Sequence, residues 1–223
     1  REAWNILNAI AEGKIESGDE KKLNALKGET MAVIALCQFD LTRCFGYPYT
    51  KDNGASLGAP LIDHLVGTYE NPSRSTVAQA YDFIIETLEE AVTLMSEEKN
   101  NGRMNKYAAR ALLARVYLYH NDNRKAFDMA EQLIKDVDAS GSYALYPHEK
   151  YVAAWSVETK FGSESFFEIA NSVDDTPGRD SWGYLLNWYG YQKGFVTQKY
   201  AEQMLADPGD VRGQLLEENK YAG

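Results

Sequence analysis

The sequence predicts a mainly α-helical fold in which helices pair into hairpins that stack as in a solenoid. Three observations predict it. Apolar residues recur every three or four positions in residues 76–95 and 104–137, which is the spacing of one face of a helix. Residues 29–45 are apolar on nearly all sides, as in a helix that is packed on several sides. A polar turn, Asn121-Asp122-Asn123, divides residues 104–137 into two helices of about 15 residues, which is the pattern of an αα-hairpin.

Composition limits the class of protein and of partner. The chain has 223 residues, of which 44% are hydrophobic and 25% charged, and this fits one folded domain or a compact pair. Its formal net charge of -10 argues against a nucleic-acid partner, because phosphate binding needs a basic surface. No run approaches the roughly 20 apolar residues of a membrane span, and the first residues lack the apolar core of a signal peptide. We expect a single helical domain, truncated at both ends, with a helical hairpin core in residues 1–139 and a loop-rich ligand side in residues 140–223.

The helix of residues 29–45 is expected to end at Gly46 and Pro48, since glycine accepts a left-handed cap and proline cannot donate the next hydrogen bond. Cys37 and Cys44 lie seven positions apart within it, about 10 Å along the helix axis. This distance excludes a disulfide between them, because bonded cysteines have Cα atoms within about 7 Å. We expect two buried free thiols.

A long loop follows, from residue 47 to residue 72. Its turn residues, among them Gly54 and Pro60, show no sustained period. A loop of this length is unusual in a compact domain, and such loops more often have a function than not. Tyr49 and Asn53 are therefore candidate ligand contacts.

The next helix is marked by Thr76 and Gln79, at the spacing of a capping box in which each side chain bonds the other residue's backbone N–H. The apolar stripe of this helix consists of Val77, Tyr81, Ile84, Leu88, Val92 and Met95. Glu86, Glu89 and Glu90 lie off the stripe, which favours a solvated face over a metal or acid–base site.

Residues 104–137, the predicted hairpin, give the strongest indication of the fold in this sequence. Asn105 can cap its first helix, and a row of alanines allows the two helices to pack closely. The spacing of Leu113, Ala114, Tyr117 and Ala126 matches the first positions of the tetratricopeptide-type sequence pattern. The residues that follow match the later positions of that pattern poorly.

Beyond residue 140 the sequence predicts mostly loops. Residues 165–169 predict a short strand or an extended buried segment, and residues 199–205 predict a short helix. Between these two segments lie six candidate ligand-binding residues, Trp182, Tyr184, Asn187, Trp188, Tyr189 and Tyr191. Their spacing fits neither a helix nor a strand, so we expect the rings to be presented from a loop.

These aromatic side chains suit a sugar ligand. A Trp or Tyr ring can lie over the apolar C–H face of a sugar, while neighbouring amide and charged groups bind its hydroxyls. The alternative is that the rings pack this loop onto the helices.

The sequence carries no signature of catalysis or of a cofactor. His64, His120 and His148 are far apart and lack metal-ligand spacing. Residues 121–123 lack the glycine and glutamate of a calcium loop, so we interpret them as a turn with a helix cap. Phosphate loops, nucleophile elbows and kinase signatures are absent. We predict no enzyme activity, no bound metal and no cofactor.

Six stretches, in the same order along the chain, resemble the SusD/RagB-like nutrient-binding lipoproteins of Bacteroidetes outer membranes. The stretch with the most specific resemblance is residues 102–119, Gly-Arg-Met-Asn-Lys-Tyr-Ala-Ala-Arg-Ala-Leu-Leu-Ala-Arg-Val-Tyr-Leu-Tyr. The others are residues 28–49, which end in Phe45-Gly46-Tyr47-Pro48-Tyr49, and residues 57–61, 74–91, 164–169 and 207–212. Residues 30–34 lack the arginine that is usual in the family's early helix.

The resemblance implies tetratricopeptide-like helix hairpins with a less regular remainder, and a role without catalysis. That role is the capture of an oligosaccharide or other nutrient at the cell surface and its delivery to a TonB-dependent SusC-like transporter. It also implies attachment to the outer membrane through a lipid anchor that is absent from this chain. A different function remains open, namely a tetratricopeptide-like scaffold that binds a peptide or protein partner in a helical groove.

Overall fold

The computed structural model describes residues 1–15, 17–100, 102–155, 160–172, 174–186, 190–191 and 194–216. The chain divides into two compact units. The first comprises residues 1–143 together with 166–168, and the second comprises residues 144–165 and 169–223. The described residues are mainly helical, with one small two-stranded sheet, so the expected mainly α fold is confirmed.

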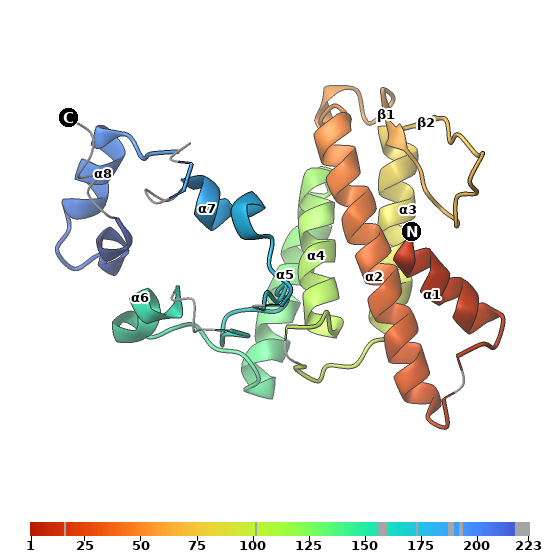
Figure 1. Ribbon diagram of the computed structural model, residues 1–223, viewed down its shortest axis with the longest axis horizontal. Helices are drawn as coiled ribbons and strands as arrows, with labels where there is room; N and C mark the ends of the chain where they lie inside the picture. Colours follow the sequence, from red (N-terminus) through yellow and green to blue (C-terminus); the bar gives the residue numbers. More distant parts are fainter. Residues whose placement is uncertain are drawn as a thin grey trace. The chain divides into compact units, whose positions relative to one another are not determined.

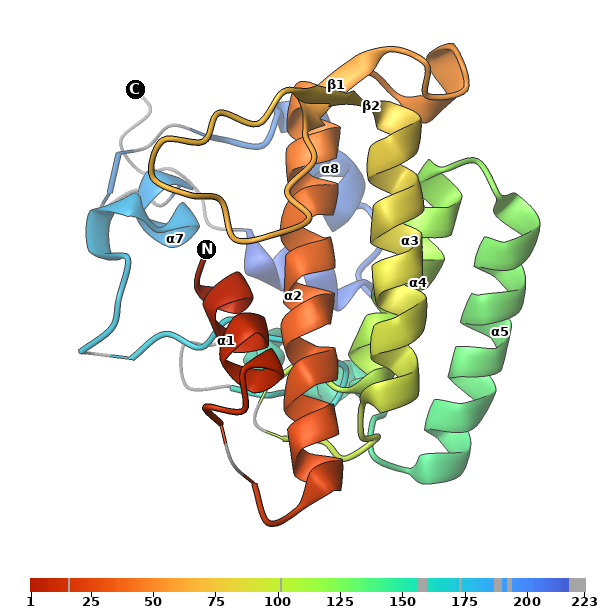
Figure 2. The same cartoon turned by 90° about the vertical axis from the view of Figure 1, so that its right-hand side faces the viewer.

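The first unit is a row of helices in which α2, α3, α4 and α5 lie side by side and α1 packs against α2 (Figures 1 and 2). The helices are α1 (Glu2–Ala11), α2 (Glu20–Phe45), α3 (Val77–Leu94), α4 (Lys106–Tyr119) and α5 (Asn123–Ser140). The core of the unit lies between α2, α3 and α4, and the largest of its fully buried side chains are Phe39, Ile84, Leu88, Leu113, Val77 and Val116. Helix-on-helix packing of apolar stripes therefore holds this unit together.

Helix α2 begins earlier than predicted and ends where predicted. Asp19 caps it by accepting hydrogen bonds from the backbone N–H groups of Lys21 and Lys22 at 3.0 and 3.3 Å, and Gly46 follows its last residue. Cys37 and Cys44 are free, but both are exposed, so their expected burial is wrong. Residues 29–45 of the helix are apolar on nearly all sides, yet α3 covers only one of its faces, and the two thiols lie outside the buried set of residues.

The long loop contains a short antiparallel ladder that the sequence analysis missed. Strand β1 (Leu57–Pro60) pairs with β2 (Arg74–Thr76) in an irregular register. The Arg74 guanidinium donates to the Gly58 carbonyl oxygen at 2.7 Å, and the buried Gln38 amide of α2 donates to the Pro60 carbonyl at 3.1 Å. Strands of four and three residues are too short to show alternation, and side-chain hydrogen bonds from α2 and β2 tie β1 in place.

Helix α3 has the predicted capping box. The Thr76 hydroxyl accepts the Gln79 N–H at 3.1 Å, and the Gln79 side chain accepts the Thr76 N–H at 2.9 Å. All residues of the predicted stripe except the partly buried Val92 are buried. Glu89 and Glu90 are exposed as expected, and they also bond neighbouring helices, since Glu89 accepts the Tyr117 hydroxyl and Glu90 pairs with Lys27.

Helices α4 and α5 form the predicted hairpin. Asn105 caps α4 by accepting the Ala108 N–H at 3.0 Å, and Asp122 caps α5 by accepting the Lys125 N–H at 3.2 Å. Residues 121–123 are thus a turn with a helix cap, as we interpreted them. Phe127 and Ile134 lie exposed on the outer face of α5 rather than in the core, because only one face of this last helix has a partner within the unit.

Residues 165–169 are not a strand. Phe166 and Phe167 are partly buried against the core of the first unit, whereas Ile169 is exposed. The alternative prediction, an extended buried segment, therefore holds for two of its residues.

The described part of the second unit consists of short helices and turns. They are η2 (His148–Lys150), α6 (Tyr151–Ala154), η3 (Gly178–Asp180), α7 (Trp182–Leu186), α8 (Gln198–Leu205) and η4 (Val211–Leu215). Helix α8 confirms the predicted short helix at residues 199–205. The Asp210 carboxylate binds the Arg212 guanidinium and its backbone N–H, which lowers the pKa of Asp210 to about 2. These bonds give a structural role to the Asp210-Val211-Arg212 motif.

Every helix in the described ranges is too short or too polar to span a bilayer.

Candidate functional site

The predicted aromatic surface begins on a short helix. Trp182 and Tyr184 lie in α7, and Tyr191 lies in the turn that follows. Ser181 starts the helix, because its hydroxyl accepts the Tyr184 N–H at 3.1 Å and its carbonyl accepts the Leu185 N–H at 3.0 Å. The expectation that all rings come from a loop is therefore wrong for Trp182 and Tyr184. A helix of five residues is too short to show helical periodicity in the sequence.

Tyr184 and Tyr191 are brought together by a closed turn. Their ring centroids are 5.2 Å apart with planes at 82°, an edge-to-face pair. The Tyr191 N–H donates to the Tyr184 carbonyl oxygen at 2.9 Å. Gly190 permits this closure, because a Cβ there would lie 1.7 Å from the same carbonyl oxygen. Tyr184 thus fixes the position of Tyr191, whose ring stays about half exposed.

Among the predicted rings that the structure describes, Trp182 is the most exposed. Its side chain is 78% exposed, and it has no ring partner among the described residues. Both roles of Trp182, as a ligand contact and as a ring that packs this segment onto the helices, stay predictions. Asn187, Trp188 and Tyr189 lie outside the described residues, so their roles stay predictions.

Tyr49 and Asn53 belong to the first unit and shape its loop. The Tyr49 ring packs against Tyr81 at 5.6 Å and against His120 at 4.2 Å between centroids. Asn53 and Gly54 both have positive φ angles, 53° and 75°, and a Cβ at Gly54 would lie 2.7 Å from the Ala78 backbone nitrogen. The ring contacts give Tyr49 a structural function, and the positive φ of Asn53 places it at a turn position that asparagine tolerates. The contact of either residue with a ligand stays a prediction.

A ring cluster that was not predicted from the sequence lies at the C-terminal end of α2. The Arg43 guanidinium, paired with Asp40, lies 4.8 Å from the Phe39 ring centroid and 5.4 Å from that of Tyr119. Phe39 also meets Tyr119 edge-on at 5.4 Å. The cluster holds the partly exposed Tyr119 ring in place. The signal available was the spacing of Asp40 and Arg43, which puts opposite charges on one helix face.

His64 closes the loop between β1 and β2. Its Nδ1 lies 2.6 Å from the Asp63 carboxylate and its Nε2 2.6 Å from the Glu70 carboxylate, which also accepts the Gly67 N–H at 3.0 Å. Both ring nitrogens donate only in the charged imidazolium. The bonds to Asp63 and then Glu70 raise the pKa of His64, and the bonds from Gly67 and then His64 lower the pKa of Glu70.

We expect the stability of this loop to fall as the pH rises. Because the pKa of His64 is higher in the folded loop than in the unfolded chain, its contribution is complete below about pH 6.5 and is lost as the pH passes the folded pKa. Hydrogen-exchange protection of residues 63–70, corrected for intrinsic exchange, should decrease above pH 6.5 in the parent chain and stay level in His64→Gln. An NMR titration that gives His64 an unshifted pKa would contradict this result.

Comparison with known proteins identifies the family. A SusD-like family model, described as starch-binding and associating with the outer membrane, matches residues 1–118, more than half of the chain. The chain belongs to the SusD-like family.

Crystal structures of other SusD-like proteins resemble the chain closely. A SusD superfamily protein from Bacteroides vulgatus ATCC 8482 is 95% identical over 100% of this chain, with a TM-score of 0.94. A putative sugar binding protein from the same strain is 38% identical over 98% of the chain, with a TM-score of 0.87. A SusD superfamily protein from Bacteroides thetaiotaomicron VPI-5482 is 35% identical over 98% of the chain, with a TM-score of 0.85. The chain covers 50%, 50% and 48% of these proteins, so it spans about half of their length. No curated protein sequence matches it.

The candidate ligand contacts in the described part of this SusD-like chain include the exposed aromatic rings of Trp182 and Tyr191. Within that part, no three His, Cys, Asp or Glu side chains gather as metal ligands. Burial raises the pKa of Tyr81 to about 12, which keeps that phenol neutral. The candidate surface consists of an open indole and a fixed tyrosine pair, which suit stacking on a flat apolar face.

Proposed function

We propose that this SusD-like chain is part of a non-catalytic cell-surface protein that binds oligosaccharides and delivers them to a TonB-dependent SusC-like outer-membrane transporter. The observation that carries the proposal is the open indole of Trp182 in a chain of a starch-binding, outer-membrane family. A relative that is 38% identical is described as a putative sugar binding protein, which supports the same ligand class. Anchoring through a lipid on the longer protein would keep it at the membrane surface.

The surface supplies both contacts that a sugar needs. An indole or phenol ring can cover the C–H face of a pyranose, and this suits Trp182 and the half-exposed Tyr191. Hydroxyl partners are available in η3, which contacts α7 and carries Arg179 and Asp180, both exposed. Stacking and neutral hydroxyl bonds depend little on net charge, so binding should tolerate salt.

Trp182→Ala should weaken glycan binding about tenfold or more, because removal of a stacked ring loses its whole contact area. The measurement is retardation on native gels cast with a panel of soluble polysaccharides, among them starch and laminarin. Trp155→Ala is the matched control, since Trp155 is also an exposed tryptophan of the second unit, at 66%, and packs against Tyr151. Equal retardation of the parent and both variants would place the site elsewhere.

A second function is favoured by the exposed Phe127 and Ile134 on the outer face of α5. In arrays of helix hairpins, an apolar outer face usually has a further layer or a partner. A scaffold that binds a peptide or protein through this face would keep its partner in Trp182→Ala and lose it in Phe127→Ala. The same variants therefore separate the two functions.

A further inference from the structure

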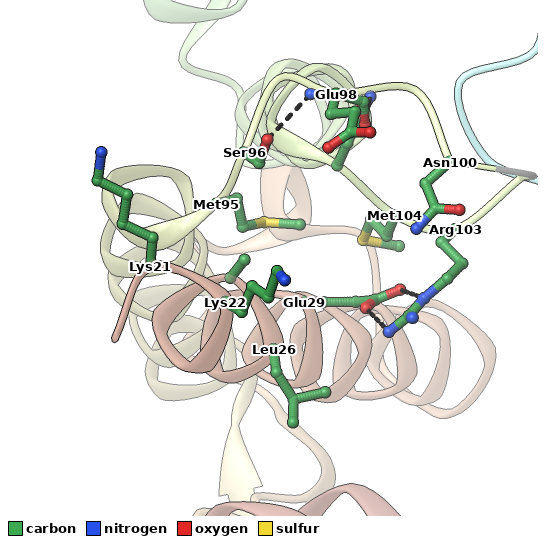
Figure 3. Close-up of a pocket in the computed structure, with 12 residues that line it drawn as sticks. Lys21, Lys22, Leu26, Glu29, Met95, Ser96, Glu98, Asn100, Arg103 and Met104 are labelled. Atoms are coloured by element: carbon green, nitrogen blue, oxygen red, sulfur yellow. Dashed lines mark hydrogen bonds and ion pairs between the residues drawn. The ribbon is translucent and has the colours of Figure 1, made fainter. Parts of the chain in front are cut away.

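A cavity of about 530 Å³ lies at the N-terminal end of α2, wholly within the first unit. It is formed by the first turns of α2 and by the connection between α3 and α4, residues 95–105 (Figure 3). Its volume lies in the range of small-molecule sites. The loop with Tyr49 and Asn53 follows the opposite end of α2, so this cavity is separate from the ligand contacts predicted there.

The floor of the cavity is apolar. It is made by the nearly buried Met95 and Met104. Leu26 of α2 also lines the cavity, but its side chain points away from the two methionines (Figure 3). Gly28 lets α2 and α3 approach here, because a Cβ at this position would lie 2.6 Å from the Met95 Cγ and 2.9 Å from the Ala91 carbonyl oxygen. Thioether side chains are polarizable and adapt to the shape of a ligand.

The rim carries polar groups of both signs. Arg103 and Glu29 form a two-bond pair, with Nε to Oε1 at 3.1 Å and Nη2 to Oε2 (Figure 3). This pair engages two of the five guanidinium N–H donors, and the other three have no hydrogen-bond partner among the described residues. The side chains of Lys21, Glu98 and Asn100 also line the cavity, and none of the three has a side-chain hydrogen bond within the described ranges.

We infer that this cavity is a second glycan subsite, which takes one neutral hexose unit; this inference rests on the proposed function for its ligand class. The charged residues that line the cavity are Lys21, Lys22, Glu29, Glu98 and Arg103. An anion would therefore meet two carboxylates, and a cation would meet three basic groups. A neutral polyhydroxyl ligand uses all of them, with carboxylates accepting and cations donating hydrogen bonds. The C–H face of the sugar lies on the methionine floor.

The methionines make this subsite observable. The chain has five methionines, and only Met95 and Met104 line the cavity. In a ¹³C-methyl-methionine NMR titration with maltoheptaose or laminarihexaose up to about 20 mM, well above a millimolar Kd, we expect the Met95 and Met104 signals to shift and saturate. The signals of Met31 and Met129, in the same unit, should stay in place. Met95→Leu and Met104→Leu assign the two signals.

Substitutions of polar residues at the rim test whether these side chains bind the sugar. Glu98→Gln and Asn100→Ala should each weaken the methionine-detected affinity about tenfold, the equivalent of one lost hydrogen bond to a charged or amide group. Glu86→Gln is the matched control, since Glu86 is an exposed glutamate of α3 that does not line the cavity. Unchanged affinity in both rim variants would overturn the subsite.

The outcomes separate this inference from the proposed function. If a polysaccharide retards the chain on gels while its oligosaccharide leaves Met95 and Met104 unmoved, the subsite is wrong and glycan binding stands. If both methionines shift and Trp182→Ala binds normally, the subsite stands and the aromatic surface is not the main site. If no polysaccharide retards the chain and no methionine shifts, both proposals fail.

Discussion

Phe39→Ala should lower the free energy of unfolding of the first unit by about 3–5 kcal/mol, the range for removing a buried aromatic ring. Phe39 is 0% exposed. Its ring makes edge-to-face contacts with Tyr81 at 6.1 Å and with Tyr119 at 5.4 Å, and Arg43 lies over it. The substitution removes transfer free energy and leaves a cavity between α2, α3 and the end of α4.

The measurement is urea unfolding followed by far-ultraviolet circular dichroism, because α2 to α5 contribute most of the helical signal. Phe127→Ala is the matched control. Its ring is 59% exposed on the outer face of α5, so its loss should cost less than about 1 kcal/mol. Similar losses for the two variants would mean that Phe39 is not part of the core.

The sequence predicted α3, α4, α5 and the end of α2 because their signals are local; α1 and the first residues of α2 were not predicted. The capping residues Thr76, Asn105 and Asp122 each bond the backbone that their position indicates, and these bonds span three residues. The exposure of Cys37 depends on which face of α2 has a neighbour, which is a tertiary property. The same holds for β1, which is tied by hydrogen bonds from Gln38 and from Arg74.

The candidate site could be predicted only in part from the sequence. Composition indicates a surface rich in rings, and the structure separates their roles, with Trp182 open and Tyr184 paired to Tyr191. The cavity at the start of α2 gave no sequence signal. Glu29 and Arg103 form its pair across 74 positions, and pairing over such distances follows from the fold alone.

Asn105→Ala should lower the free energy of unfolding by about 2–4 kcal/mol, more than an ordinary helix cap. Asn105 is only 5% exposed. Its side-chain oxygen accepts the Ala108 N–H at 3.0 Å, and its side-chain nitrogen donates to the Tyr143 hydroxyl oxygen at 2.8 Å. Tyr143 is itself buried beside Tyr107 and Phe166. The substitution therefore removes the cap and also leaves a buried hydroxyl without its partner.

A double-mutant cycle with Tyr143→Phe separates these two costs. Removing both partners leaves no orphaned hydroxyl, so the double variant should lose about 1 kcal/mol less than the sum of the two single variants. Asp122→Ala is the matched control, because Asp122 caps α5 in the same way and bonds the Lys125 N–H at 3.2 Å; it should cost about 1 kcal/mol. If Asn105→Ala costs no more than Asp122→Ala and the cycle shows no coupling, the bond to Tyr143 does not stabilise the start of the hairpin. A larger cost with coupling would mean that one buried amide both starts α4 and fixes Tyr143 at the end of the first unit.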